Sequence, residues 1–141
     1  MSSDADVNSS DDSGSRIGPT ILWSMLKGKK VITNDGKDIG EIKDISENYI
    51  RLEKGSIKKD KFWIPKYTAD AYDGKVLWLL TNEEELLDKY RYGAEPLGEQ
   101  YVKDLESFKG TPSGQNATNR GPDFDRNIRV VENYKNIRDL K

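Results

Sequence analysis

The stretch LKGKKVITNDGKDIGEIKDI, residues 26–45, decides the fold class of this chain of 141 residues. Its β-branched run Val31–Thr33 predicts a strand, and the Asp-Gly pair that follows predicts a tight hairpin turn, because glycine takes a positive φ at no steric cost. Residues 38–46 are then the return strand, in which Gly40 indicates a bulge or a close backbone approach. The isoleucines, spaced by three, also suit a helix, but the glycines and the turn favour a bulged strand.

Three more segments downstream predict strands. Residues 48–53 alternate between two faces, and residues 61–64 form a strand that Pro65 ends, since proline cannot donate to a ladder. A second Asp-Gly turn precedes residues 76–80, which are apolar on both faces. The sequence therefore predicts a mainly β domain of short strands.

The quoted stretch resembles the opening of the PRC-barrel family, with its Leu-x-Gly-x-x-Val strand, Asp-Gly turn and Ile-Gly-x-Ile return. The likeness continues through FWIPKYTADAYDGKVLWLLTNEEEL, residues 62–86, and covers about residues 24–88. It implies a small barrel of five or six strands that docks to proteins, often as a homodimer, and is not an enzyme. The family includes the cytoplasmic domain of the photosynthetic reaction-centre H subunit, a domain of a ribosome maturation factor, and stand-alone prokaryotic proteins, some tied to archaeal cell division.

Two short helices are expected after the strands. Thr81 and Glu84 have the spacing of a capping box, which predicts a helix to about Tyr90 with Leu86 and Leu87 facing inward. Pro96 suits the first turn of a second helix that ends near Lys109. Its apolar residues fall on one stripe at Leu97, Tyr101, Leu105 and Phe108.

The chain divides into five parts by composition. Residues 1–20 are an acidic Ser/Asp tail with little to bury, which predicts disorder. Residues 21–92 are the PRC-barrel-like domain, and residues 93–109 are the C-terminal helix. The Gly/Pro/Asn-rich residues 110–127 predict a flexible linker, and residues 128–141 are a candidate partner-docking segment.

Composition argues against catalysis. The chain has no cysteine and no histidine, which excludes thiolate chemistry, disulfides and the usual general base. The run Glu83–Glu85 suits a helix N-terminus, where negative charge is favourable. We expect no metal and no cofactor. The absence of a long apolar run and of a signal-peptide pattern predicts a cytoplasmic protein.

Partner binding is expected from apolar residues that one barrel layer cannot bury. Strand 76–80 places Val76, Trp78 and Leu80 on one face and Leu77 and Leu79 on the other, so the outward face needs a cover. The second helix or a partner copy across a two-fold axis would serve. The candidate partner-binding residues are Leu77, Leu79, Trp63, Ile128, Val131, Tyr134 and Arg138.

The C-terminal segment has two interpretations. Its spacing of apolar residues suits a short amphipathic helix that orders only on binding a partner, with Arg129, Lys135 and Arg138 drawn to an acidic surface. Alternatively, it packs back on its own or a neighbouring barrel.

A rival function is RNA binding, or assembly of ribosomes. Aromatic residues (Tyr49, Phe62 and Trp63) lie among the basic ones, as in surfaces that grip single strands. The candidate nucleic-acid-binding residues are Lys27, Lys29, Lys30, Lys58, Lys59 and Lys61. The acidic second half of the chain and its pI of 5.3 argue against this function.

Overall fold

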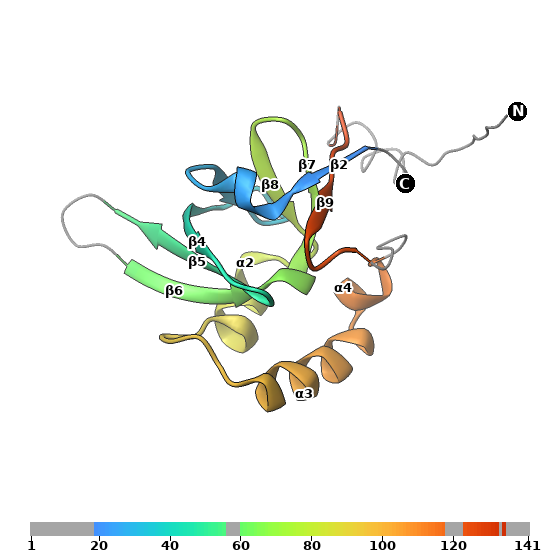
Figure 1. Ribbon diagram of the computed structural model, residues 1–141. Coiled ribbons are helices and arrows are strands. Elements are labelled where there is room, and N and C mark those ends of the chain that lie inside the picture. The colour runs from blue at the N-terminus through green and yellow to red at the C-terminus, as the bar shows by residue number, and fades with distance from the viewer. Residues whose placement is uncertain (1–18, 56–59, 118–122, 133, 135–141) are drawn as a thin grey trace, which may run out of the picture.

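The computed structural model describes residues 19–55, 60–117, 123–132 and 134. Within these residues the chain is mainly β, as the sequence predicts, with eight strands in two sheets followed by helices. Figure 1 shows the strands gathered in the upper part of the molecule and helices α3 and α4 beneath them.

The larger sheet has six strands in the order β6-β5-β4-β3-β8-β7. Their bounds are Lys30–Ile32 (β3), Asp38–Ile45 (β4), Tyr49–Lys54 (β5), Asp60–Pro65 (β6), Ala69–Tyr72 (β7) and Val76–Leu79 (β8). Neighbouring strands are antiparallel except β3 and β8, which run parallel. The expected strands between residues 30 and 80 are therefore confirmed.

The sheet curves strongly but hydrogen bonds do not close it into a barrel. In the described part of the chain, β6 and β7 are the two edge strands and do not pair with each other. Each edge is covered locally instead, β6 by a bridge from Trp63 to Tyr92 and β7 by a bridge from Tyr72 to Val130. The resemblance implies a closed barrel, but in the described part of the chain the sheet is open between β6 and β7.

Gly40 is a site of close backbone approach, as the sequence suggests. Its φ is +120°, and an added Cβ would lie 2.6 Å from the carbonyl oxygen of Glu53 on β5. The register of β3 against β4 shifts next to it, between Lys30 and Ile32. Only glycine fits where the two backbones come this close.

The first helical segment follows β8 but is capped differently from the prediction. Helix α2 (Glu83–Glu85) begins after Asn82, whose side chain accepts a hydrogen bond of 2.7 Å from the Glu85 N–H. Thr81 is fully buried instead, and its hydroxyl has no hydrogen-bond partner among the described residues. The chain continues as a π-helical turn, Leu86–Tyr90, in which Leu86 is buried but Leu87 is exposed, contrary to expectation.

Helices α3 (Gly98–Lys109) and α4 (Pro112–Gln115) follow. Phe108 on α3 is buried and Tyr101 and Leu105 pack against the core, as the predicted stripe requires, whereas Leu97 precedes the helix and is exposed. Helix α4 lies inside the segment predicted to be a flexible linker. It is packed tightly, since a Cβ on Gly114 would lie 1.8 Å from the carbonyl oxygen of Phe108.

The smaller sheet joins the two ends of the described chain. Strand β2 (Thr20–Leu22) pairs antiparallel with β9 (Asn127–Arg129), with Ile21 opposite Ile128. The helix predicted to start at Ile128 is therefore a strand at its beginning, and Thr20 belongs to the fold and not to the tail. Residues 1–18, the body of the predicted disordered tail, lie outside the described residues.

Candidate interaction surfaces

One end of the curved sheet is filled by a cluster of aromatic side chains, here called the tyrosine end: Tyr49, Tyr67, Tyr90, Tyr92, Tyr101 and Phe108. The Phe108 ring lies 4.8 Å from that of Tyr67 and 5.8 Å from that of Tyr90, measured between centroids. The Tyr92 hydroxyl donates to the Asp104 carboxylate on α3. Helix α3 is thus fastened across this end by ring packing and one charged hydrogen bond.

Burial dominates the acid–base behaviour of these tyrosines. It raises the pKa of Tyr49 and of Tyr90 to about 12, with the charges of Asp104 and Glu85 as smaller causes. Burial also raises the pKa of Tyr67, and burial with the hydrogen bond to Asp104 raises that of Tyr92. These hydroxyls therefore stay protonated at neutral pH and offer no general base.

A second anchor holds the segment before β9. The buried Lys66 Nζ donates to the Asp125 carbonyl oxygen at 2.6 Å and lies 5.3 Å from the centre of the Trp23 ring. The Trp23 indole N–H donates to the Phe124 carbonyl oxygen at 2.7 Å. Burial lowers the pKa of Lys66, and the negative charges of Asp125 and Glu47 offset this lowering in part.

Strand β8 points Leu77 and Leu79 into the core, whereas partner binding through these residues would require them on the surface. Both leucines are fully buried in the main core, so their assignment as a partner-binding surface is corrected. The outer face of the sheet carries Val76 and Trp78, and Ile32 and Ala71 join them from β3 and β7. This outer face is the one that needs a cover.

The cover is the C-terminal segment of the same chain. Val131 and Tyr134 are buried against Trp78, and the Tyr134 ring stacks on the Trp78 ring with centroids 5.0 Å apart and planes at 13°. Ile128 is fully buried in the main core. Ile128, Val131 and Tyr134 thus pack back on their own chain, as in the alternative interpretation, and Arg138 lies outside the described residues.

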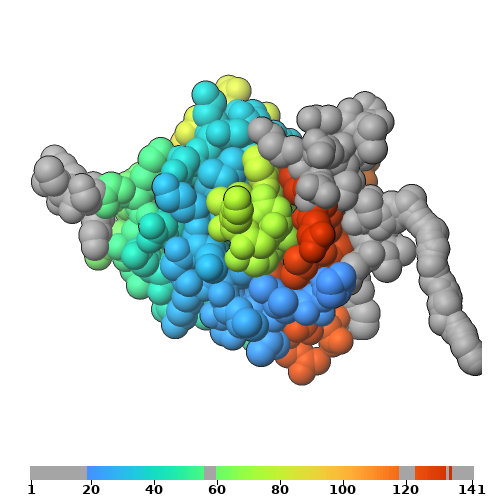
Figure 2. Space-filling model, turned by 90° about the horizontal axis from the view of Figure 1, so that it is seen from above, coloured from blue at the N-terminus to red at the C-terminus, as the bar shows by residue number. Residues whose placement is uncertain are grey.

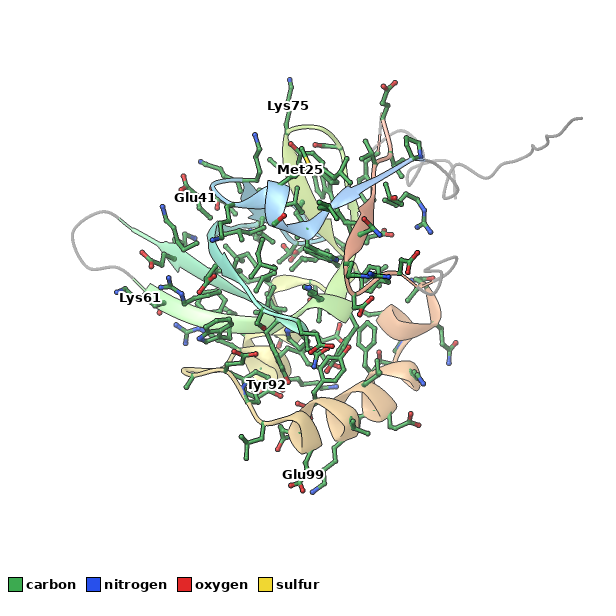
Figure 3. All side chains as sticks on the ribbon, in the orientation of Figure 1. Met25, Glu41, Lys61, Lys75, Tyr92 and Glu99 are labelled. Carbon is green, nitrogen blue, oxygen red and sulfur yellow. The ribbon has the colours of Figure 1, made fainter. Side chains whose placement is uncertain are left out.

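A third surface, here called the helix surface, is formed by the start of α3 and the loop before it. Leu97 is 78% exposed and Val102 is 59% exposed. A hollow of about 480 Å³ lies beside Leu97, lined among others by Tyr92, Pro96 and Gln100. Figure 3 shows Glu99 pointing away from the barrel, and Val102 lies one helical turn further along the same side.

The candidate nucleic-acid residues do not form one cluster. Lys27, Lys29 and Lys30 are exposed near the start of β3, whereas Lys61 is on β6, and strands β4 and β5 lie between the two. Lys27 and Lys30 are paired with Asp44 at 3.9 Å and Asp38 at 3.3 Å. Lys58 and Lys59 lie outside the described residues.

The aromatic residues expected to stack on bases are also poorly placed. Tyr49 and Phe62 are buried, and Trp63 is half-buried and bridged to Tyr92. Stacking needs an exposed ring face, which two of these three residues lack. The geometry therefore gives no support to RNA binding through this set.

Within the described residues, no group of three or more His, Cys, Asp or Glu side chains is arranged to hold a metal ion. None of the helices in that part of the chain has the length and apolar character needed to cross a bilayer.

Residues 19–77 match the family model of the PRC-barrel domain. The chain contains a PRC-barrel domain. This is the family that the motifs of residues 26–45 resemble. PRC-barrel domains are generally non-catalytic and commonly mediate protein interactions. No curated protein and no solved structure matches the chain in the corresponding searches.

Most strands of the PRC-barrel domain could be predicted from the sequence, but strand β7 and two surfaces of the molecule could not. The exposure of Leu97 was missed because its spacing fits the buried stripe, although it precedes the helix. The contact of Tyr134 with Trp78 joins residues far apart in the chain, so no local sequence pattern predicts it. The one available signal was that both faces of strand 76–80 are apolar.

Proposed function

We propose that this protein is a non-enzymatic adaptor whose PRC-barrel domain binds another protein through the helix surface. The observation that carries the proposal is the exposure of Val102 on helix α3, and of Leu97 just before it, where the tyrosine end holds the helix in place. Large apolar side chains on a rigid element, beside a hollow, are the usual anchors of an interface.

Charge indicates the kind of partner. Glu95 and Glu99 line the hollow beside Leu97, together with Lys103 as the one basic residue among the lining set. We expect a partner that presents an apolar side chain ringed by lysine or arginine. Rim charges of this kind raise the rate of association and set specificity more than they raise affinity.

We also propose that the protein acts in the cytoplasm. The family resemblance further implies a role in cell division or in the assembly of a larger complex. Trp63 stays within the proposed surface, because its backbone is bridged to Tyr92, which lines the same hollow.

A differential capture experiment tests the helix surface. Wild-type protein, Leu97→Asp/Val102→Asp and Leu22→Asp/Met25→Asp are immobilised and exposed to a nuclease-treated native lysate. Leu22 and Met25 are 52% and 61% exposed, and Met25 lies at the other end of the molecule from Glu99 (Figure 3), so the second variant is a matched control.

We expect a protein that wild type and control capture alike and that the helix-surface variant loses by about tenfold or more, which corresponds to about 1.4 kcal/mol. Titration calorimetry with the purified partner then gives the same ranking. An identical captured set for all three proteins, or capture that nuclease abolishes, would contradict the proposal.

A further inference from the structure

A second exposed apolar surface, here called the N-terminal patch, is formed by Leu22 and Met25. Strand β2 runs into a 3₁₀ turn, Trp23–Leu26, in which Trp23 and Leu26 are buried. Side chains three residues apart eclipse each other in a 3₁₀ helix, so Leu22 and Met25 lie together on the opposite, exposed side. Figure 2 views the molecule from this end, where β2 and the turn (blue) lie at the surface beside β9 (red).

The backbone under the N-terminal patch is held firmly. The Trp23 N–H donates to the Arg126 carbonyl oxygen at 2.9 Å, and its indole N–H donates to the Phe124 carbonyl oxygen at 2.7 Å. The buried Lys66 ammonium lies against the Trp23 ring and balances the charge of Asp125. A partner that covers the patch therefore has only side chains to order, and not the backbone, which lowers the entropic cost of binding.

Basic side chains surround the N-terminal patch. Three exposed basic residues flank it: Lys27, Lys29 and Arg126. The Asp44 carboxylate lies 3.9 Å from the Lys27 Nζ, and the Asp123 carboxylate lies 2.9 Å from the Arg126 guanidinium, so these two charges are partly balanced. Lys29 forms no ion pair with an acidic residue in the described part of the chain. The patch is therefore an apolar pair whose surroundings carry a positive charge.

The helix surface has the complementary features. Its hollow of about 480 Å³ lies beside Leu97, and two carboxylates line it, Glu95 and Glu99, against the single basic side chain of Lys103. Four of the five large apolar side chains that are exposed in the described part of the chain belong to the helix surface or to the N-terminal patch. The hollow is expected to bind an apolar side chain ringed by basic residues, and the N-terminal patch of this same chain is such a group.

We propose that the N-terminal patch of one copy of the chain binds the helix surface of the next, so that copies assemble head to tail. Met25 and Glu99 lie at opposite ends of the molecule (Figure 3), so two copies cannot make both contacts with each other. Each contact then leaves a free patch at one end and a free helix surface at the other. A contact between unlike surfaces that does not close produces an open row of copies, and not a dimer with two-fold symmetry.

This inference rests on the helix surface of the proposed function and names a second copy of the chain as one of its occupants. A different partner protein competes with that copy for the helix surface at the end of a row. In the capture experiment above, native copies of the chain are identified by their peptide masses and set apart from other captured proteins. They bind both double variants, because each variant keeps one of the two surfaces intact.

Sedimentation velocity of the full chain tests the assembly at concentrations up to about 1 mM, which detects dissociation constants in the micromolar to millimolar range. We expect the mean sedimentation coefficient of the wild type to rise with concentration beyond the value of a dimer. Leu22→Asp/Met25→Asp and Leu97→Asp/Val102→Asp each remain monomeric alone. An equal mixture of the two gives a dimer and nothing larger, since one intact patch then meets one intact helix surface.

Charge reversal gives a second test that keeps the apolar side chains and serves if an aspartate variant folds poorly. Lys27→Glu/Lys29→Glu and Glu95→Lys/Glu99→Lys should each weaken assembly by about tenfold or more, and their mixture should restore it, because opposite charges then meet again at every contact. Leu87→Asp is the matched control. Leu87 is the fifth exposed apolar residue and lies outside both surfaces, so this variant should assemble as the wild type does.

A wild type that stays monomeric at every concentration, or that stops at a dimer, would overturn the inference. So would an equal mixture of the two aspartate variants that contains no dimer. Capture of another protein by the helix surface without any such assembly would leave the proposed function in place and remove this inference alone.

Discussion

The two covers of the PRC-barrel domain are built on different principles. The tyrosine end is closed by α3, which follows the strands closely in sequence and packs ring against ring. The outer face is closed by Val131 and Tyr134, which return from the far end of the chain. At the tyrosine end, the Tyr49 hydroxyl is buried and has no hydrogen-bond partner in the described part of the chain. At the outer face, by contrast, the polar atoms are bonded. The Tyr134 hydroxyl donates to Asp70, and the Trp78 indole N–H donates to Asp73 at 2.7 Å.

This difference suggests that one cover mainly stabilises the fold by packing, whereas the other selects the segment that binds to it. Packed rings, which close most of the tyrosine end beside the one hydrogen bond from Tyr92 to Asp104, tolerate rearrangement as long as volume is conserved. Buried polar groups accept only partners that satisfy them. We therefore expect the tyrosine end to contribute most of the stability and the outer face to determine which segment binds. Four substitutions test this contrast.

The largest effect is expected for Phe108→Ala at the tyrosine end. Phe108 is buried between Tyr67 and Tyr90, and its removal leaves a cavity beneath α3. The free energy of unfolding should fall by about 3–5 kcal/mol. Val102→Ala on the exposed side of the same helix is the control and should change it by less than about 0.5 kcal/mol in denaturant titrations. Equal effects of the two substitutions would show that α3 does not close this end.

Gly40→Val tests the framework that both covers share. The added side chain meets the backbone of Glu53 and forces a positive φ on a β-branched residue. Strain and overpacking together predict a loss of about 2–4 kcal/mol. Gly36→Asn is the comparison, because Gly36 has a φ of +85° but open space around it, and asparagine tolerates that conformation. If Gly40→Val lowers the free energy of unfolding by no more than Gly36→Asn does, the close backbone approach at Gly40 is not what makes glycine necessary there.

The same two glycines show how far the sequence predicts this fold. The Asp-Gly turns, five of the six strands of the larger sheet and the buried part of the stripe on α3 are local patterns of period or turn chemistry, so they could be predicted from the sequence, whereas strand β7 was not expected. The orientation of β8 was not, because Leu77 and Trp78 are both large and apolar and only the packing of a distant segment decides which one faces outward. The β2–β9 pairing joins opposite ends of the chain, and three-residue strands are too short to show a period.

Tyr134→Phe sharpens the contrast at the outer face. The substitution keeps the stacked ring on Trp78 and deletes the hydrogen bond to Asp70. We expect a loss of about 1–2 kcal/mol, since a buried bond to a carboxylate is stronger than a neutral one. Double-mutant analysis with Asp70→Asn measures how much of this loss belongs to the pair. Additive losses for the two substitutions would show that the hydroxyl and the carboxylate are not coupled.

The smallest effect at neutral pH is expected for the corresponding change at the tyrosine end, Tyr49→Phe. The Tyr49 hydroxyl is buried without a hydrogen-bond partner in the described chain, so its removal should leave the free energy of unfolding unchanged or raise it slightly. The pH dependence gives a second measurement. In the folded protein burial raises the pKa of Tyr49 to about 12, above the value near 10 of an unfolded chain.

Between these two values the unfolded state releases the proton and the folded state keeps it, so stability falls as pH rises from about 10 to about 12. Tyr49→Phe removes one such group and should make the loss of stability between pH 10 and pH 12 smaller. Part of the loss should remain, because burial also raises the pKa of Tyr90 to about 12. Urea unfolding at pH 7, 10 and 11, with tyrosinate absorbance followed in parallel, checks both points. A stability loss at pH 7 as large as that of Tyr134→Phe would mean that the Tyr49 hydroxyl is bonded in solution, and the distinction between the two covers would fail.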